Sequence, residues 1–397
     1  MEICWIEKLL PYPGYVIDSI SFSAELVHVR MHRDRRRRLA CPECGGPMWK
    51  NEERQRIVSD MPMLGAKAVW IQYNAVTGKC SRCKASSVLH PPGIDPYSQA
   101  TRRLKEYVSQ LCRYMPASHV PEFVDISHET ARRYDKEILN EKVGKPDLEN
   151  LRYILIDEKA IGKHHKYVTV VLNAENGELL FMQPGKKKST LEAFYAMIPE
   201  EKRCHIEAIG TDRSGAYVNA SREQCPDADI VFDRFHLVKS LNEAIDEVRR
   251  KEVTDAKKED KRFIKGQRYN LLRHEENLKE DQAVKLNELL AINENLHTAY
   301  VLKEAFHHLY DYVYPANARK YLARWCSWAF ESGLAPLASF AQGLLRDSEN
   351  ITSYFKHQIT NGPIEAFNSV LGRIIYMACG IKDLDYLFLK MRQKSTQ

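Results

Sequence analysis

Three acidic side chains stand at places in the sequence where carboxylates can gather and do chemistry. Asp157 ends the apolar run at 151–156, Asp212 ends the run at 205–211, and Glu365 lies in the first turn of an expected helix. Functional groups collect at strand ends, where loops leave room for water and ligand. Two neighbouring carboxylates repel each other unless a cation screens them, and Mg²⁺ or Mn²⁺ binds such oxygens together with water and phosphate. The set predicts a metal centre for chemistry on phosphates.

Each of these acids also has an ordinary explanation. Acidic residues stabilise the first turn of a helix through the helix dipole, so Glu365 alone indicates no more than a helix start. Asp233 ends another short apolar run and competes with Asp212 for the second position in the site. The combination of acids at several element ends is what favours a catalytic site.

The stretch NGPIEAFNSVLGR at 361–373 is expected to form the helix that carries Glu365. Pro363 suits the first helical position, because its missing N–H is not needed there. A narrow face of mainly small or polar residues includes Glu365 and Asn368. That face can approach a metal site without blocking a bulky substrate.

An alternation of strands and helices is expected to position the first two carboxylates. Apolar runs around the turn signal Asn176–Gly177 predict a meander, and the capping-box pattern STLE predicts a helix that begins at Ser189. The predicted strands are 151–157, 166–172, 178–183, 205–212 and 229–233. Their order implies an antiparallel meander at the edge of a mixed sheet. If the first and fourth strands are neighbours, Asp157 and Asp212 face each other.

Four of the ten cysteines form two C-x-x-C pairs, Cys41 with Cys44 and Cys80 with Cys83. Each pair presents two thiolates from a tight turn, and an intervening hairpin brings the pairs together, as a structural Zn²⁺ site requires. A redox pair is the alternative, but it needs a βαβ context that is absent here. Four thiolates complete the coordination of the ion, so no catalytic zinc is implied.

Basic residues near the cysteine region are candidates for contact with DNA. Four consecutive arginines precede the first cysteine pair: Arg35, Arg36, Arg37 and Arg38. They form either a phosphate-contacting arm or a solvated edge. Two short helices follow, and Ser127 suits the N-cap of the second. This second helix would expose side chains that reach base edges and phosphates: His128, Thr130, Arg132 and Arg133. A helix-turn-helix is therefore favoured over a plain helical linker.

The composition is that of an ordinary globular protein, with 44% hydrophobic and 28% charged residues among 397. The net charge of +6 is a mild excess of positive charge and is compatible with a polyanionic partner. No stretch approaches the roughly 18 consecutive apolar residues that span a bilayer, and the N-terminus lacks the features of a signal peptide. A reducing cytosol is therefore expected, in which disulfides do not form.

These motifs together resemble those of insertion-sequence transposases with an RNase H-like DDE core, and more narrowly the ISL-three family. The resemblance spans nearly the whole chain. It depends on the cysteine pairs, the helix pair and four short motifs: Ile156–Glu158 (IDE), Thr211–Tyr217 (TDRSGAY), Asp233–His236 (DRFH) and Asn361–Asn368 (NGPIEAFN). The last three are specific in combination.

The resemblance implies a metal-dependent phosphoryl transfer. Asp157, Asp212 and Glu365 would hold two Mg²⁺ or Mn²⁺ ions, water would cut at the element's ends, and the freed 3′-hydroxyl would attack target DNA. Asp233 and His236 look like an accessory acidic-x-x-His signature; the histidine orients Asp233, contacts a phosphate or simply packs. Asn368 is a third accessory residue. Strand order favours Asp212 over Asp233 as the second carboxylate.

The expected fold is a multidomain α+β chain with an RNase H-like mixed α/β core. Its expected parts are a zinc-ribbon-like domain at 1–95, a helix-turn-helix at 96–147, the first part of the core at 148–250, an all-helical insertion at 251–350 and the last part of the core at 351–397. The expected partners are double-stranded DNA, as terminal inverted repeats and as target, and a second copy of the chain, because two ends must be paired. The expected place is the bacterial cytoplasm, beside the nucleoid, and no membrane partner is expected.

Two other functions remain open. One is a sequence-specific DNA-binding protein with an inactive RNase H-like fold, against which the presence of all three acids argues. The other is an RNase H-like nuclease that cuts without joining. A two-carboxylate glycosidase fits poorly, because it leaves the cysteine pairs and the basic N-terminal region without a purpose.

Overall fold

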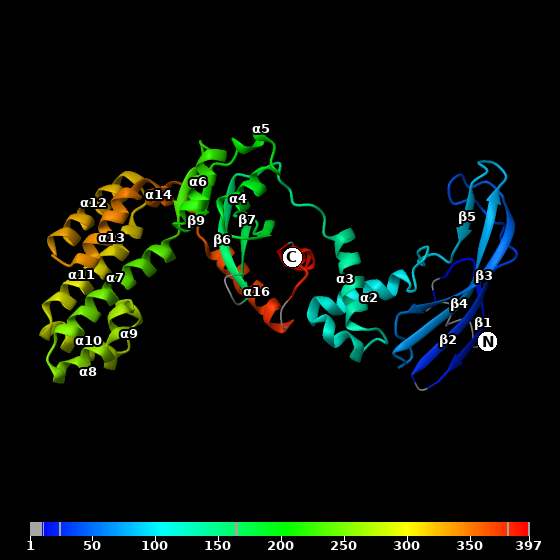
Figure 1. Ribbon diagram of the computed structural model, residues 1–397, viewed down its shortest axis with the longest axis horizontal. Helices are drawn as coiled ribbons and strands as arrows, with labels where there is room; N and C mark the ends of the chain where they lie inside the picture. The colour runs from blue at the N-terminus through cyan, green and yellow to red at the C-terminus, as the bar shows by residue number, and fades with distance from the viewer. Residues whose placement is uncertain (1–9, 11, 24, 163–165, 379–380, 396–397) are drawn as a thin grey trace. The chain divides into compact units, whose positions relative to one another are not determined.

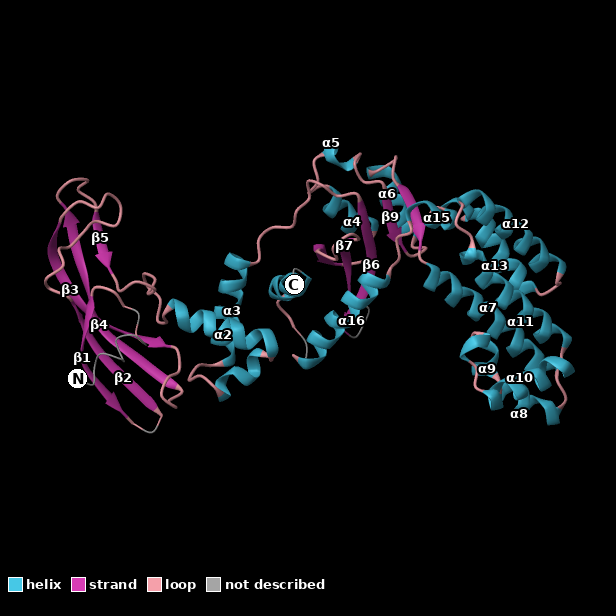
Figure 2. Ribbon diagram, turned by 180° about the vertical axis from the view of Figure 1, so that it is seen from behind, coloured by secondary structure: helices cyan, strands magenta, loops and turns pink. Residues whose placement is uncertain are grey.

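The computed structural model describes residues 10, 12–23, 25–162, 166–378 and 381–395 (Figures 1 and 2). The chain divides into two compact units. The first comprises Met1–Gly144 with Ile374–Gln393, and the second comprises Lys145–Arg373 with Lys394–Gln397. Among the described residues, no helix is both long and apolar enough to cross a membrane.

The first unit begins with a five-stranded mixed sheet. Its strands are β1 Tyr15–Phe22, β2 Leu26–Arg33, β3 Met48–Asp60, β4 Ala68–Cys80 and β5 Ser86–Leu89. The order is β1-β2-β4-β3, with β5 also paired to β4, and only β2 and β4 run parallel. Alternate side chains of these two strands, such as Val29 and Ile71, are fully buried in one hydrophobic core.

A helix pair follows the sheet, as the sequence predicts. Its elements are α2 Arg102–Tyr114, the 3₁₀ helix η1 Ala117–Glu122 and α3 His128–Lys142. The hydroxyl of Ser127 accepts a hydrogen bond from the N–H of Thr130, so the expected N-cap is present. Leu104 and Val108 of α2 are buried against Ala131 of α3 in one small core.

The last helix of the chain, α17 (Leu384–Ser395), packs on this helix pair. Asp135 of α3 is fully buried. Its carboxylate accepts hydrogen bonds from the hydroxyls of Ser109, at 2.7 Å, and Tyr386, at 2.6 Å. Lys390 Nζ of α17 lies 3.1 Å from the same carboxylate. A buried carboxylate is tolerated because an ammonium group and two hydroxyls replace its water.

The C-terminal segment is therefore divided between the two units. The sequence placed all of 351–397 with the catalytic core, whereas Ile374–Gln393 group with the first unit. The physical reason is the packing of α17 on α2 and α3 through the Asp135–Lys390 pair. This pair joins positions far apart in the chain, so no local pattern indicates it.

The second unit contains another five-stranded sheet. Its strands are β6 Tyr153–Gly162, β7 Lys166–Asn173, β8 Leu179–Pro184, β9 Ala208–Thr211 and β10 Asp229–Phe232. Their order is β10-β9-β6-β7-β8. The strands β6, β7 and β8 form an antiparallel meander, while β9 and β10 run parallel to β6. The expected mixed sheet with a meander at one edge is confirmed, although β6 continues five residues beyond Asp157.

Three helices accompany this sheet: α4 Lys188–Tyr195, α5 Glu200–Arg203 and α6 Gly215–Gln224. The predicted capping box at Ser189 is wrong. The helix begins one residue earlier, at Lys188, and its N-cap residue Lys187 makes no side-chain cap. The backbone starts the helix instead, because the N–H of Thr190 donates to the carbonyl of Lys187 at 3.0 Å.

A bundle of helices without strands fills the region after β10 (Figure 2). Its elements are α7 Arg234–Asp255, α8 Lys258–Gly266, α9 Arg268–Leu272, η2 Glu275–Asn277, α10 Glu280–Ile292, α11 Glu294–His307, η3 His308–Asp311, α12 Pro315–Glu331 and α13 Ala335–Arg346. Trp325 lies fully buried at its centre, and its indole N–H donates to the carbonyl of Leu302 at 2.8 Å. The core of the bundle is continuous with that of the sheet.

The chain then returns to the sheet through short helices and one long one. These are α14 Ser348–Thr352, α15 Tyr354–His357 and α16 Gly362–Met377. The helix α16 begins at Gly362, so Pro363 is its second residue and not the first as expected, although it still lies in the first turn. Its buried side includes Ile364, Phe367 and Leu371. This helix brings Glu365 from the far end of the sequence to the sheet.

The buried pair of Asp135 and Lys390 yields a stability prediction. Lys390→Met keeps the aliphatic volume but leaves the buried carboxylate without its cation, so we expect a loss of about 3–5 kcal/mol in the free energy of unfolding. The double variant Asp135→Asn/Lys390→Met should lose less than the sum of the single changes, because no uncompensated charge remains. Denaturant unfolding of the full chain measures both quantities.

A matched control lies one residue along α3. Lys136 binds Asp383 at 2.8 Å, but both side chains are about one-third exposed to solvent. Lys136→Met should therefore cost less than about 1 kcal/mol. Equal losses for Lys136→Met and Lys390→Met would contradict this account of how α17 is held.

Candidate active site

Three adjacent parallel strands bring aspartates to the same level, one within β6 and two directly after β9 and β10. Ile156 of β6 pairs with Thr211 of β9, and Thr211 pairs in turn with Phe232 of β10. The next residue on each strand is an aspartate: Asp157, Asp212 and Asp233. Neighbouring strands lie about 4.8 Å apart, so the register brings these carboxyl groups to one edge of the sheet.

Asp157 is held by two hydrogen bonds. Its Oδ1 accepts the N–H of Glu158 at 2.8 Å, and its Oδ2 accepts the side-chain amide of Asn368 at 2.7 Å. Burial, together with the nearby charge of Asp212, raises the pKa of Asp157 to about 6. Each oxygen keeps a lone pair, so the carboxylate can still bind a cation.

Asp212 lies in the turn that joins β9 to α6. Its Oδ1 accepts the N–H of Ser214 at 3.0 Å, and its side chain is half-buried. The next residue, Arg213, donates from Nε to Asp347 at 2.9 Å, at the end of α13. This ion pair fixes the turn that carries Asp212 to the helical bundle. The sequence analysis missed it, because 134 residues separate the two side chains.

Asp233 is engaged in a different way. It caps α7, and its Oδ2 accepts the N–H of His236 at 3.3 Å and contacts the imidazole Nδ1 at 2.8 Å. The hydrogen bond to Asp233 raises the pKa of His236, and the charges of Asp212 and Asp157 add to the effect. This contact is the one that the first of the three roles predicted for His236 requires, and the other two roles stay predictions.

Glu365 and Asn368 lie one helical turn apart on α16. Residues separated by three positions share a face of a helix, so the Glu365 side chain projects on the side where Asn368 binds Asp157. Glu365 is exposed, whereas Asn368 is only 6% exposed. Among the described residues, the side-chain oxygen of Asn368 has no hydrogen-bond partner. The amide of Asn368 thus joins the helix of the third carboxylate to the strand of the first.

The four expected cysteines converge in the first unit. Their sulfur atoms all lie within 4.8 Å of one another, with Cys41 and Cys83 at 3.6 Å and Cys44 and Cys80 at 3.5 Å. Tetrahedral coordination with bonds of about 2.3 Å places sulfurs about 3.8 Å apart, so the cluster fits a metal ion. Hydrogen bonds from the N–H groups of Cys83 and Arg82 lower the pKa of Cys80 to about 6, which favours a thiolate ligand.

The residues expected to contact DNA lie on the surface of the first unit. The arginines of the basic run are exposed: Arg35, Arg36, Arg37 and Arg38. On α3, the exposed side chains are His128, Arg132 and Arg133, opposite the face that packs on α2. Thr130 is half-buried, and its hydroxyl accepts a hydrogen bond from Ser127 at 3.2 Å.

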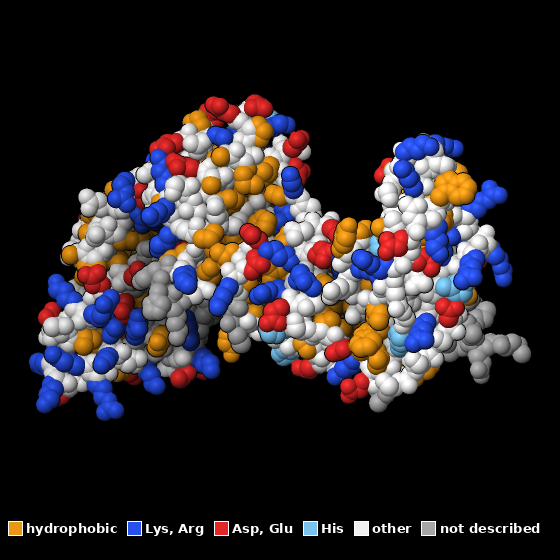
Figure 3. Space-filling model, turned by 45° about the vertical axis from the view of Figure 1, so that its right-hand side comes forward, with side chains coloured by type: hydrophobic (Ala, Val, Ile, Leu, Met, Phe, Trp, Pro, Cys, Tyr) orange, Lys and Arg blue, Asp and Glu red, His pale blue; other side chains and the backbone are white. Residues whose placement is uncertain are grey.

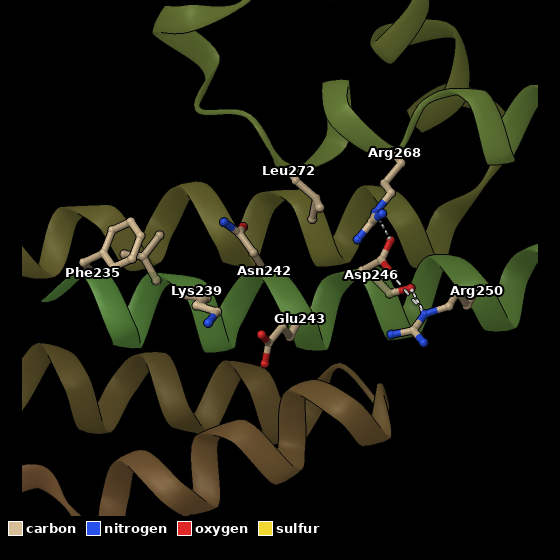
Figure 4. Close-up of a pocket in the computed structure, with 9 residues that line it drawn as sticks. Phe235, Lys239, Asn242, Glu243, Asp246, Arg250, Arg268 and Leu272 are labelled. Carbon is tan, nitrogen blue, oxygen red and sulfur yellow. Dashed lines mark hydrogen bonds and ion pairs between the residues drawn. The ribbon is translucent and has the colours of Figure 1, made fainter. Parts of the chain in front are cut away.

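A cavity of about 310 Å³ lies along α7, beyond the Asp233–His236 pair (Figure 4). Phe235 and Lys239 line one end, and Asp246 lies at the other. The Asp246 carboxylate binds Arg249, at 2.8 Å, and Arg268, at 3.2 Å. Because Asp246 is paired with arginines of the bundle, the carboxylates at the sheet edge are the better candidate for chemistry.

The raised pKa of Asp157 predicts a pH-dependent stability. An unfolded aspartate titrates near pH 3.9, so the folded state holds a proton up to about pH 6 that the unfolded chain has already lost. The resulting loss of folding stability is absent below about pH 4, grows between pH 4 and 6 and is complete above pH 6. Without added divalent metal, Asp157→Asn should therefore stabilise the protein at pH 7.5, by about 1–3 kcal/mol, and have little effect at pH 4.

Denaturant unfolding at the two pH values measures this difference. Asp227→Asn removes an exposed carboxylate of the same unit and serves as the control, with little change expected at either pH. Destabilisation by Asp157→Asn at pH 7.5 would show that the buried carboxylate carries no such penalty.

Comparison with known proteins agrees with this arrangement. The family model for the DDE transposase domain of the ISL3 family, described as a transposase, matches residues 154–391. A second model, the helix-turn-helix domain of transposase family ISL3, matches residues 89–139. The first match contains Asp157, Asp212, Asp233 and Glu365, and the second contains α2 and most of α3.

Individual relatives are also named as transposases of insertion sequences. The transposase for insertion sequence element IS1001 of Bordetella parapertussis is 32% identical over 358 residues, which cover 89% of this chain and 88% of that protein. The transposase for insertion sequence element IS1557 of Mycobacterium tuberculosis (strain CDC 1551 / Oshkosh) is 30% identical over 256 residues, which cover 59% of this chain and 57% of the relative. With both domain models matched and nearly the whole length aligned, the chain belongs to the ISL3 family of insertion-sequence transposases, enzymes with a DDE domain and a helix-turn-helix DNA-binding domain.

Proposed function

We propose that this transposase cuts the ends of its element and joins them to target DNA at a site formed by Asp157, Asp212 and Glu365. The observation that carries the proposal is the hydrogen bond of 2.7 Å between Asn368 and Asp157. This bond holds α16, the helix of Glu365, against the strand that pairs with the strand of Asp212. Three carboxylates from distant parts of the sequence can then share one ligand.

An RNase H-like fold is the proposed architecture of the catalytic unit. Support comes from the strand order β10-β9-β6-β7-β8, with an antiparallel meander and two parallel strands on the other side of β6. The first carboxylate then lies on the central strand and the second at the end of its parallel neighbour. The helical bundle α7–α13 enters between β10 and the helix of the third carboxylate.

Asp212 is the proposed second carboxylate, and Asp233 the accessory one. Asp233 caps α7 and binds His236 through Oδ2, and only 9% of the residue is exposed. Asp212 is half-buried and accepts a backbone hydrogen bond through Oδ1. It is therefore better able to offer an oxygen to a cation. The hydrogen bond to Asp233 raises the pKa of His236 and so favours its cationic form near the site, where phosphate oxygens come.

Mg²⁺ or Mn²⁺ is the proposed catalytic cofactor. Two such ions, when bound, promote formation of the attacking hydroxide or alkoxide and stabilise the leaving oxygen. The protein contributes oxygen ligands from three elements and orients them before the substrate arrives. Asn368 keeps the Asp157 carboxylate in one orientation, and the Arg213–Asp347 pair does the same for the turn of Asp212. Such outer contacts typically change metal affinity or activity by about 10–100-fold.

The first unit is proposed to bind the terminal inverted repeats of the element. Its α3 carries exposed cationic side chains suited to a major groove, and the arginines of the basic run are suited to phosphates. Zn²⁺ is the proposed ion of the cysteine cluster, in a structural role, because four thiolates leave no open position. Two ends must be paired for joining, so a dimer or larger assembly on DNA is proposed.

The assignment predicts which substitutions abolish cutting. Asp157→Asn, Asp212→Asn and Glu365→Gln should each lower cleavage by about 1000-fold, since a lost metal ligand costs several kcal/mol of transition-state stabilisation. Asp233→Asn should lower it by only about tenfold. Cleavage and joining of a plasmid that carries the element's own flanking DNA, with Mg²⁺, measures both steps.

DNA binding by each variant, measured by gel shift, is the control for folding. Retained cutting by Asp212→Asn with loss in Asp233→Asn would exchange the roles of these two residues. Cutting without joined products would show that the enzyme is a nuclease that does not transfer strands. Specific end binding without any cutting, by a wild-type protein loaded with metal, would favour the inactive fold.

A further inference from the structure

The end of the N-terminal sheet that holds the cysteine cluster exposes a group of basic residues around an aromatic one. We call it the knuckle face, and its members are Arg38, Trp49, Lys79, Arg82 and Lys84. All five side chains are exposed. None of them belongs to the helix-turn-helix or to the carboxylate site, and only Arg38 was expected to contact DNA.

Strand pairing puts members of the knuckle face side by side. Trp49 of β3 pairs directly with Lys79 of β4, so the two side chains project from the same side of the sheet. Ala40 pairs with Pro47, and the N–H of Met48 donates to the carbonyl of Leu39 at 3.0 Å. Continuing this antiparallel pairing by one residue brings Arg38 level with Trp49.

The turn between the last two cysteines supplies the other two cations. Arg82 and Lys84 flank Cys83, and backbone N–H groups of this turn point at the sulfur of Cys80. A side chain added at Gly46 would come within 3.1 Å of Arg82 Cβ, so the two turns of the cluster are closely packed. The cations therefore stand on a scaffold that a bound ion would make rigid.

These cations are not neutralised locally. Within the described residues, Arg38, Lys79 and Arg82 make no ion pair, and Lys84 donates only to the carbonyl of Ser81, at 2.9 Å. Of the nearby acids, Glu53 is already bound to Lys50 at 2.6 Å. Figure 3 shows Lys and Arg side chains gathered at the upper end of the lobe on the right, beside exposed hydrophobic atoms.

Trp49 gives the surface a second property. Its side chain is 74% exposed, although tryptophan is among the costliest residues to leave in water. A large aromatic ring surrounded by unpaired cations matches a ligand with negative charges spaced along an apolar frame. The sugar–phosphate backbone of DNA has this character, and neighbouring arginines and lysines select it over an apolar protein surface.

We propose that the knuckle face binds the backbone of the element's DNA end, outside the segment read by α3. Arg38, Lys79, Arg82 and Lys84 contact phosphates, and Trp49 packs against the sugars. The inference rests on the proposed binding of element ends by the first unit, and it assigns a second contact region on the same DNA. Phosphate contacts carry no base information, so this region lengthens the footprint without changing the sequence that is read.

The salt dependence of end binding tests the proposal. Each lost phosphate contact reduces the magnitude of the negative slope of log K against log salt concentration by about 0.9, so Lys79→Gln/Arg82→Gln/Lys84→Gln should make the slope less negative by about 2–3. Trp49→Ala should weaken binding about fivefold or more, because buried tryptophans dominate many interfaces. The loss should be the same for end DNA and for DNA of unrelated sequence.

Lys258→Gln/Lys265→Gln/Lys285→Gln removes three exposed lysines of the helical bundle and is the matched control, with no change in slope expected. Metal content of each variant shows that the cysteine cluster is intact, and Trp49→Ala tests the face without touching that turn. Hydroxyl-radical footprinting should show protected sugars next to the α3 site that disappear in the triple variant.

An unchanged slope and footprint in a triple variant with full metal content would overturn the proposal, as would a wild-type chain that binds no DNA. The two proposals fail separately. If the wild-type protein cuts DNA and the triple variant binds DNA normally, the proposed function stands and the role of the knuckle face is overturned. If the triple variant binds DNA more weakly but the wild-type protein never cuts, the knuckle face stands and the proposed function is overturned.

Discussion

The parallel pairing of β9 with β6 is the constraint on which the catalytic unit depends. It aligns Thr211 with Ile156 and thereby places two carboxylates, Asp212 and Asp157, at the same level of adjacent strands. Burial raises the pKa of Asp157, and the charge of Asp212 acts in the same direction, so the ionised pair is unfavourable in this setting. A divalent cation relieves both the repulsion and the loss of water. Without a metal ion, these carboxylates therefore lower the folding stability of the protein. Groups with perturbed pKa values of this kind are common at functional sites.

The remaining features of the unit serve to hold that edge together. The helix α16 is attached through Asn368, which binds Asp157 and lies one helical turn from Glu365. The bundle is attached through Arg213 and Asp347, beside the turn of Asp212. In the proposed function, the first unit separates recognition from chemistry, because its exposed cations lie on α3 and around the cysteine cluster. The stability of the first unit depends on the buried pair of Asp135 on α3 and Lys390 on α17.

Much of this arrangement was predictable from local patterns. Apolar runs that end in acids predicted the strands next to Asp157, Asp212 and Asp233. Ser127 predicted the start of α3. The cysteine spacing indicated a cluster that the structure brings within metal-binding distance. The pattern at Ser189 misled, because a capping box and an ordinary first turn look alike in sequence. The partners of Arg213 and Asp135 were not predictable, since an ion pair between distant positions has no period and no motif.

Metal-directed cleavage of the protein backbone tests the central claim most directly. Fe²⁺ in place of Mg²⁺, with ascorbate and peroxide, generates radicals that cut the chain close to the bound ion, and mass spectrometry locates the cuts. The account predicts cuts near Asp157, Asp212 and Glu365 together, suppressed by excess Mg²⁺ and lost in Asp157→Asn. Cuts near Asp157 and Asp233 without any near Glu365 would contradict it, because the third carboxylate would then lie away from the metal.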